Sequence, residues 1–266
     1  MNFPFERIRH LLIDLDGVLY RGDTAVEHAA AFISWVRSRG IAFRLVTNNA
    51  TLTPQEYVTK LARMGIEVGQ DEIFTSALAA SMYVQQQGDG SQTAYAIGED
   101  GLLDALTSAR VRIVTERPDW VVVGLDRHVT YEKLSIAALA IESGARFLGT
   151  NPDTSLPTEQ GLVPGAGAIL AALVATTGVR PTVIGKPQPL MLELAIQQMN
   201  ASIEDTAMVG DRLDTDIQGA NELGLPSILV LTGVSTRGDL AQSRSRPDLI
   251  VDNLAELIGL WERHSA

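Results

Sequence analysis

Two aspartates one residue apart follow a short apolar run near the start of the chain. If residues 11–13 form a buried strand, Asp14 and Asp16 lie on the same side of its carboxyl end, because side chains alternate along a strand. Open α/β sheets bind their ligands at that end of the strands. Two carboxylates about 4 Å apart repel by roughly 4 kcal/mol at an effective dielectric near 20. The pair therefore requires a cation, a shared proton, or both.

The same residues also fit simpler structures. Asp16 and Gly17 between apolar residues are typical of a two-residue hairpin turn. A calcium loop fits less well, because the third acidic ligand and the terminal glutamate of such loops are missing. Taken alone, this segment leaves the hairpin and the ligand site open.

A second group of carboxylates follows another apolar run far down the chain. Residues 206–209 precede Asp211, Asp214 and Asp216, and a hard cation prefers oxygen ligands of this kind. Helix capping is the alternative, with Asp214 as N-cap and Asp216 in the first turn. Capping leaves Asp211 unexplained.

Two further strand-like runs end in groups that suit an anion. Residues 42–46 lead to Thr47 and Asn48, and residues 182–184 lead to Lys186. Each segment alone is typical of a turn or a solvated loop. Together, the four segments share one pattern, in which a short apolar run ends in a polar residue of defined chemistry.

These four segments, in this order, resemble the haloacid dehalogenase superfamily of phosphotransferases. The Asp-Gly-Val-Leu that begins at Asp16, the Thr-Asn-Asn at Thr47 and the Gly-Lys-Pro around Lys186 are similar to its NagD-type branch, which includes p-nitrophenyl phosphatase and pyridoxal phosphatase relatives. The resemblance spans roughly residues 8–255. It implies an α/β fold, with a Rossmann-like doubly wound parallel sheet and an inserted α/β cap domain of the C2 type.

The resemblance also implies a reaction and a cofactor. Asp14 would be the nucleophile that forms an aspartyl-phosphate, and Asp16 would protonate the leaving alkoxide and then activate water. Mg²⁺ would be held by the Asp14 carboxylate, the Asp16 carbonyl and Asp211.

Other residues would bind the phosphoryl group. The resemblance implies that Thr47 and the Asn48 amide hold phosphoryl oxygens, and that Lys186 balances the charge of nucleophile and phosphate. Asp216 would lie behind the ligands and orient water or Lys186.

The order of strand-like and helix-like segments predicts a core domain over residues 1–88 and 179–266 and a cap domain over 89–178, with composition typical of linkers near 87–91 and 176–178. A helix is expected to start at Pro54 with Thr53 as its cap. The core strands are expected at 11–13, 42–46, 182–184, 207–209, 227–231 and 249–251. In the cap, strands are expected at 94–97, 120–124 and 146–148, and a helix at 131–143.

The cap is expected to select the substrate. Asn151 and Asp153 follow a cap strand, and the resemblance implies that their loop overhangs the catalytic crevice, although Asn-Pro-Asp is also a common turn. A closing cap favours small phosphomonoesters, such as nucleoside monophosphates, sugar or polyol phosphates, pyridoxal phosphate, or p-nitrophenyl phosphate in vitro. The alternatives are a phosphometabolite-binding regulatory module with little turnover and a phosphotransferase that acts on a second metabolite.

Composition limits the partners and the compartment. The formal net charge of −11 disfavours nucleic acid and anionic membranes as partners. The chain has no cysteine, which excludes disulfides, thiolate zinc sites and cysteine nucleophiles. The first residues do not resemble a signal peptide, so a cytoplasmic location is expected. The expected partner is a small phosphorylated metabolite, and the resemblance suggests a homodimer formed through the cap.

Overall fold

The chain folds into two compact units, each assembled from separate stretches of sequence. The computed structural model describes residues 3–88, 92–158 and 160–264. The first unit comprises Met1–Thr47, Gln55–Phe74 and Lys186–Ala266, and the second comprises Asn48–Pro54 and Thr75–Gly185. The second unit is thus inserted into the sequence of the first.

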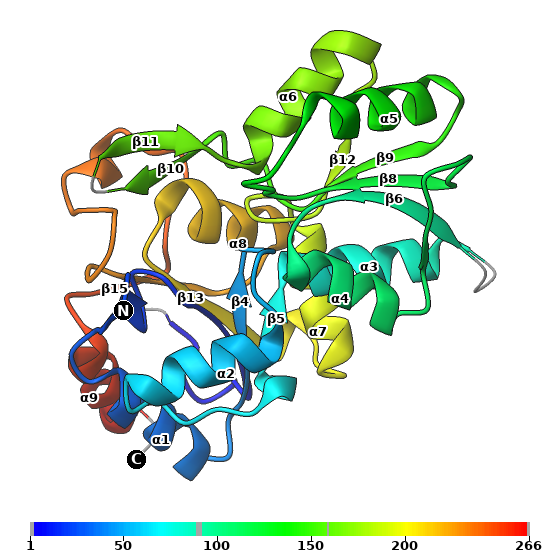
Figure 1. The fold of residues 1–266 in the computed structure, drawn as a ribbon. Coiled ribbons are helices and arrows are strands. Elements are labelled where there is room, and N and C mark those ends of the chain that lie inside the picture. The colour runs from blue at the N-terminus through cyan, green and yellow to red at the C-terminus, as the bar shows by residue number, and fades with distance from the viewer. Residues whose placement is uncertain (1–2, 89–91, 159, 265–266) are drawn as a thin grey trace. The chain divides into compact units, whose positions relative to one another are not determined.

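The first unit contains a six-stranded sheet with helices on both faces (Figure 1). The strand order is β15-β14-β13-β1-β4-β5, and the neighbouring strands from β15 to β4 pair in parallel. The central strands are buried almost throughout, so they read as continuous apolar runs in the sequence. The strands are β1 (His10–Asp14), β4 (Ala42–Thr47), β5 (Ile73–Thr75), β13 (Thr206–Gly210), β14 (Ser227–Val230) and β15 (Leu249–Val251). The α-helices are α1 (Ala29–Ser38), α2 (Pro54–Arg63), α7 (Leu190–Gln198), α8 (Gln218–Leu223) and α9 (Leu254–His264).

The strand register brings chemically useful residues to one edge of this sheet. Asp14 at the end of β1 is paired with Val46 of β4, so Thr47 lies one residue beyond it. On the other side of β1, Ile13 is paired with Val209 of β13. Asp211, which follows β13, therefore emerges at the same carboxyl edge as Asp14.

The hairpin interpretation of Asp16 and Gly17 is wrong. The antiparallel pair of the region is formed by β2 (Tyr20–Arg21) and β3 (Thr24–Ala25), and Asp16 makes only an isolated bridge to Tyr20. Gly17 has a φ of 88°, and a Cβ at this position would overlap the Asp211 carboxylate. Glycine thus lets this loop turn and approach Asp211 closely.

The second unit contains its own five-stranded sheet, in the order β12-β9-β8-β6-β7, with all neighbouring pairs parallel. Helices α5 and α6 cover one face, and α3 and α4 cover the other (Figure 1). The strands are β6 (Thr93–Ile97), β7 (Arg112–Ile113), β8 (Trp120–Val123), β9 (Arg146–Gly149) and β12 (Thr182–Val183), with a separate hairpin of β10 (Ser155–Thr158) and β11 (Gly161–Pro164). The helices are α3 (Ser76–Gln86), α4 (Asp100–Ser108), α5 (Tyr131–Glu142) and α6 (Ala166–Thr177).

Most of the predicted elements are confirmed, as is the predicted fold class. The expected cap strands correspond to β6, β8 and β9, the expected cap helix to α5, and α2 begins at Pro54 as expected. The strand expected in the core at 182–184 is a correction, because β12 pairs with β9 of the second sheet. The second unit extends beyond 89–178, since it also takes in α3, which packs on α4, and β12. Residues 89–91 of the expected linker lie outside the described residues.

The segment after β13 also differs from expectation. A π-helical turn (Leu213–Ile217) precedes α8, and Asp214 is not its cap. The Asp214 carboxylate instead accepts two hydrogen bonds from the Arg212 side chain, at 2.8 and 3.0 Å. A π-helical turn is a rare structure that occurs frequently at functional sites.

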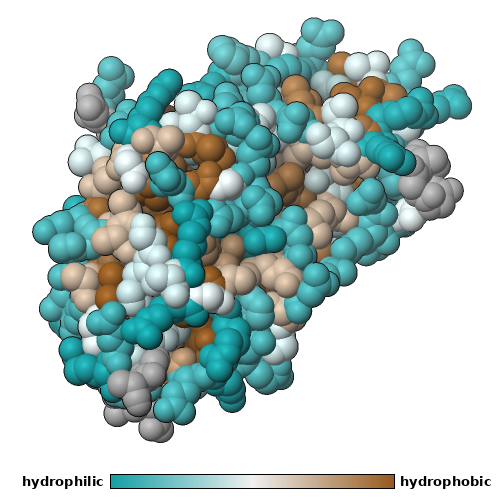
Figure 2. All heavy atoms as spheres, turned by 90° about the horizontal axis from the view of Figure 1, so that it is seen from below, coloured by the Kyte–Doolittle hydropathy of each residue, from teal (hydrophilic) through white to brown (hydrophobic). Residues whose placement is uncertain are grey.

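One face of the molecule carries both polar and apolar residues. On the face shown in Figure 2, hydrophilic residues cover most of the area, with apolar groups between them. Over the part of the chain that the structure describes, no helix has the length and apolar character needed to cross a bilayer.

Candidate active site

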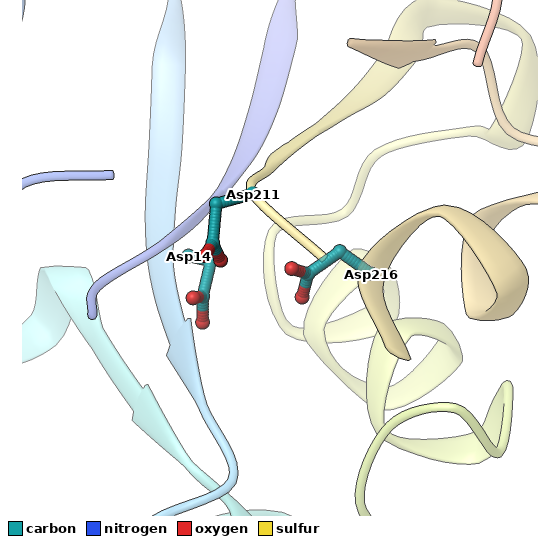
Figure 3. A group of neighbouring side chains, drawn as sticks. All are labelled: Asp14, Asp211 and Asp216. Atoms are coloured by element: carbon teal, nitrogen blue, oxygen red, sulfur yellow. The ribbon is translucent and has the colours of Figure 1, made fainter. Parts of the chain in front are cut away.

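Three aspartates from distant parts of the sequence converge in the first unit. Asp14 ends β1, Asp211 follows β13 and Asp216 lies in the π-helical turn, and their carboxylates point toward a common space (Figure 3). One oxygen of each lies within 4.8 Å of the others, and all three residues are buried. The three carboxylates therefore form one buried acidic group of the kind that could hold a metal ion.

Lys186 connects two of these carboxylates. Its Nζ donates to Asp14 Oδ1 at 2.5 Å and to Asp216 Oδ1 at 2.7 Å, with the Val46 carbonyl at 3.4 Å. The other Asp216 oxygen accepts from the Arg212 main-chain N–H at 3.1 Å. Asp216 therefore orients Lys186, while its second oxygen is tied to the backbone.

The third carboxylate has an unpaired oxygen. Asp211 Oδ2 accepts from the Val234 main-chain N–H at 2.7 Å, but its buried Oδ1 has no hydrogen-bond partner among the residues that the structure describes. A buried carboxylate oxygen without a partner is costly unless a cation or proton occupies its vicinity. A hard divalent cation fits this site, because all of the groups that could bind it are oxygens.

The pKa shifts of the site also favour a bound cation. Burial raises the pKa of Asp14 well above its usual range; Lys186 opposes this shift, and Asp216 and Asp211 add to it. Burial and the Asp216 charge raise the pKa of Asp211 to about 7. Three carboxylates share one amine, so the site retains protons at neutral pH unless another positive charge is present.

Asp16 differs from this buried group in its exposure, whereas Thr47 is buried. Asp16 lies two residues beyond Asp14, but its side chain is exposed. Partial desolvation raises the pKa of Asp16, while the nearby Lys60 and Arg21 lower it. Thr47 ends β4 and is buried. Asp16 is therefore accessible for proton exchange, which suits an acid or base.

The remaining predicted residues lie in the second unit and contact one another. Asn151 Nδ2 donates to the Asn48 carbonyl at 2.8 Å, and Asn48 Nδ2 donates to Asp153 Oδ2 at 3.3 Å. Asn151 is only 5% exposed. These residues are therefore brought together, but through their own hydrogen bonds.

The loop after β14 was not identified from the sequence. It supplies Val234 to Asp211, the Ser235 hydroxyl to the Leu213 N–H at 3.0 Å, and the Thr232 hydroxyl to the Gly17 carbonyl at 2.7 Å. The signal for this loop was present, since Thr232 follows the apolar run 227–231 just as Thr47 follows 42–46.

Fold and site together define an enzyme of the α/β class whose candidate reactive groups are carboxylates at the ends of parallel strands. Comparison with known families agrees. Residues 11–112 match the family model described as haloacid dehalogenase-like hydrolase, and residues 183–257 match a second model, described as HAD-hydrolase-like.

Individual relatives match along nearly their whole length. An acid sugar phosphatase of Staphylococcus aureus is 43% identical over 253 residues, which cover 95% of this chain and 97% of the relative. The 5'-nucleotidase YutF of Bacillus subtilis is 38% identical over 247 residues, or 93% and 96% of the two chains. The structure of NagD from E. coli K-12 is 35% identical, with a TM-score of 0.88 and coverage of 94% and 98%. This chain therefore belongs to the haloacid dehalogenase-like hydrolase family, within its NagD-type phosphatases.

Proposed function

We propose that the chain is a magnesium-dependent phosphatase that hydrolyses small phosphomonoesters through an aspartyl-phosphate intermediate. The substrates would be nucleoside monophosphates, sugar or polyol phosphates or pyridoxal phosphate, with p-nitrophenyl phosphate as a substrate in vitro. The names of the B. subtilis and S. aureus relatives support the first two classes. The observation that carries the proposal is the buried group of three carboxylates with one lysine and an unpaired Asp211 oxygen.

Mg²⁺ would be held by the Asp14 carboxylate, the Asp16 main-chain carbonyl and Asp211. When bound, it would neutralise charge on the phosphoryl oxygens during transfer. The unpaired Asp211 oxygen supports this assignment, because that oxygen has no hydrogen-bond partner among the described residues.

The residues of the chain would perform the reaction in two steps. The Asp14 carboxylate attacks phosphorus while Asp16 gives its proton to the leaving oxygen. Asp16 then takes a proton from the water that cleaves the aspartyl-phosphate. Lys186, fixed by Asp216, holds the Asp14 carboxylate in place and balances its charge. Acid–base assistance of this kind contributes about 10² to 10⁴ in rate.

Further parts of the proposal concern binding. Thr47 and the Asn48 amide would hold phosphoryl oxygens, the first unit would carry the reaction, and the second would select the substrate. The partner would be a small phosphorylated metabolite rather than nucleic acid or a membrane, in line with the net charge of −11. A cytoplasmic location and pairing of two chains through the second unit complete the proposal.

The deciding experiment is phosphate release from p-nitrophenyl phosphate with Mg²⁺ and with a chelator. We expect turnover only with Mg²⁺, and its loss in the Asp14→Asn variant, because an amide does not form the acyl-phosphate. Unchanged turnover in this variant would remove Asp14 from the proposed role. Tight binding of phosphomonoesters without turnover would favour a regulatory module instead.

A further inference from the structure

Asn151 uses its whole side-chain amide to hold the main chain of other loops. Its Nδ2 donates to the Asn48 carbonyl at 2.8 Å and lies 3.3 Å from Thr150 Oγ1, and its Oδ1 accepts from the Asp153 N–H at 3.1 Å. The residue is 5% exposed. A side chain that is buried and bonded at both polar atoms has little capacity left for a substrate.

Other hydrogen bonds hold the Asn48 carbonyl and the Asn48 side chain. The Ser76 hydroxyl donates to the Asn48 carbonyl at 2.5 Å, so this carbonyl accepts two hydrogen bonds. The Asn48 side chain donates to Asp153 at 3.3 Å. The group formed by Asn48, Ser76, Asn151 and Asp153, here called the amide cluster, thus fixes the orientation of the Asn48 peptide from several sides.

The main chain of Thr150, next to the amide cluster, holds a second segment of the chain. The Gly185 N–H donates to the Thr150 carbonyl at 2.8 Å. A Cβ on Gly185 would lie 2.6 Å from the Thr150 carbonyl oxygen and 2.9 Å from Asn151 Cβ. Only glycine therefore fits at this position without a shift of its neighbours.

The residue that the amide cluster holds is itself assigned to the phosphoryl site. Asn48 follows Thr47, and its amide would hold a phosphoryl oxygen. The held carbonyl belongs to the peptide that joins Asn48 to Asn49, and this peptide is rigid and planar. A rotation of this peptide would turn Asn48 away from the phosphoryl group.

We propose that Asn151 and Asp153 are positioning residues that hold Asn48, whose amide is assigned to the phosphoryl oxygens, instead of recognising the leaving group of the substrate. This inference rests on the proposed function. It replaces the role in substrate selection that the sequence suggested for these two residues. It predicts that they act equally on every phosphomonoester.

The test compares substrates that share the phosphoryl group and differ in the leaving group. We would measure kcat/KM of Asn151→Ala and Asn151→Asp with p-nitrophenyl phosphate, a nucleoside 5'-monophosphate and a sugar phosphate. We would also measure inhibition by inorganic phosphate, which has no leaving group. The aspartate variant keeps an acceptor for the Asp153 N–H and loses the Nδ2 donor. It is a close isostere if the alanine variant does not fold, and its carboxylate oxygen would repel the Asn48 carbonyl, so its loss should be at least as large.

We expect a loss of about five- to tenfold in kcat/KM, the value of one buried hydrogen bond, and the same factor for all three substrates. The inhibition constant of inorganic phosphate should rise by a similar factor. Gln85→Ala, which removes an exposed amide on α3, is the matched control and should change nothing. Unequal losses among the substrates with unchanged inhibition by phosphate would overturn the inference and restore substrate selection.

Failure of the proposed function would look different. A wild-type protein without turnover on any of the three substrates would contradict the phosphatase proposal. The affinity for inorganic phosphate, measured by calorimetry with Mg²⁺, would still test Asn151. An affinity that is the same in wild type and both variants would then exclude the positioning role.

Discussion

Each unit contains a lysine bound to a buried aspartate, and the two arrangements differ in charge balance. In the second unit, Lys133 Nζ lies 2.6 Å from Asp126 Oδ2 and donates to the His128 carbonyl at 3.2 Å, while Asp126 Oδ1 accepts from the His128 N–H. One amine meets one carboxylate, and both oxygens are bonded. In the first unit, one amine binds two carboxylates with a third beside them, and one Asp211 oxygen has no hydrogen-bond partner in the described part of the chain.

The two lysines also differ in how far their side chains are exposed to solvent. The Lys133 side chain is 38% exposed, whereas that of Lys186 is 3% exposed. A balanced pair whose lysine reaches the solvent, such as Lys133 with the buried Asp126, adds little to stability and costs little. An unbalanced buried group costs free energy, and such groups are typical of functional sites. Charge balance, rather than the presence of an ion pair, therefore distinguishes the candidate catalytic cluster from the ion pair of the second unit.

The largest difference between the two lysines should appear when each is replaced by methionine. Lys186→Met leaves Asp14 and Asp216 without their shared cation, so we expect kcat/KM to fall by about 10³ or more. We also expect the free energy of unfolding to fall by about 3–5 kcal/mol, the usual cost of breaking a buried ion pair.

Lys133→Met is the matched control, with the same change of side chain in a partly exposed pair. We expect it to lower the free energy of unfolding by about 1 kcal/mol or less. Urea unfolding and steady-state kinetics of both variants measure the contrast. Equal losses of stability and activity in the two variants would contradict the distinction drawn here.

A second prediction separates function from stability at Asp211. Asp211→Asn keeps an acceptor for the Val234 N–H and removes a charge that lies close to Asp216. We expect the affinity for Mg²⁺ to fall by about 100-fold or more, because a carboxylate ligand is lost. In the presence of a chelator, the melting temperature should stay the same or rise, because the repulsion is relieved.

Kinetic titration with Mg²⁺ and thermal unfolding in EDTA check this prediction. A variant that binds Mg²⁺ as the wild type does would remove Asp211 from the metal site. A melting temperature several degrees lower in EDTA would show instead that the Asp211 charge stabilises the fold.

The sequence predicted where the candidate site residues of the first unit lie better than it predicted their partners. Asp14, Thr47 and Asp211 could be placed because each follows a short apolar run, and parallel strands bring their carboxyl ends to one edge of a sheet. Lys186 contacts Asp14 although the strand before it belongs to the other sheet. The predicted strand 182–184 failed because the same pattern fits two sheets. An apolar run indicates a strand, but it does not specify which neighbour pairs with it.

The roles of Asp214 and Asn151 show the second limit. Helix propensity makes Asp214 an N-cap, but Arg212 two residues earlier offers a stronger partner and the segment forms a π-helical turn. The partner of Asn151 is the main chain of Asn48, 103 positions away, and a main-chain carbonyl carries no signal in the sequence. Contacts between side chain and distant backbone are therefore visible only in the structure.

The smallest predicted effect is a difference in the sign of the pH response between the two units. Burial raises the pKa of Asp211 from 3.8 to about 7, so its charge destabilises the metal-free fold increasingly as pH rises through this range. In the second unit, the Arg127 guanidinium lowers the pKa of Glu99 below 4.5, so the stabilisation by Glu99 is full above this value and is lost as pH falls through the folded pKa.

Two variants isolate these responses in urea unfolding experiments with EDTA. Relative to wild type, Asp211→Asn should gain stability steadily between pH 4 and pH 7. Glu99→Gln should lose about 0.5 kcal/mol at pH 7, a value reduced by the exposure of Arg127, and progressively less below pH 4.5. The opposite slopes arise because the fold disfavours the charged form of Asp211 and favours that of Glu99. Slopes of the same sign in the two variants would show that the buried cluster tolerates its negative charge without a cation.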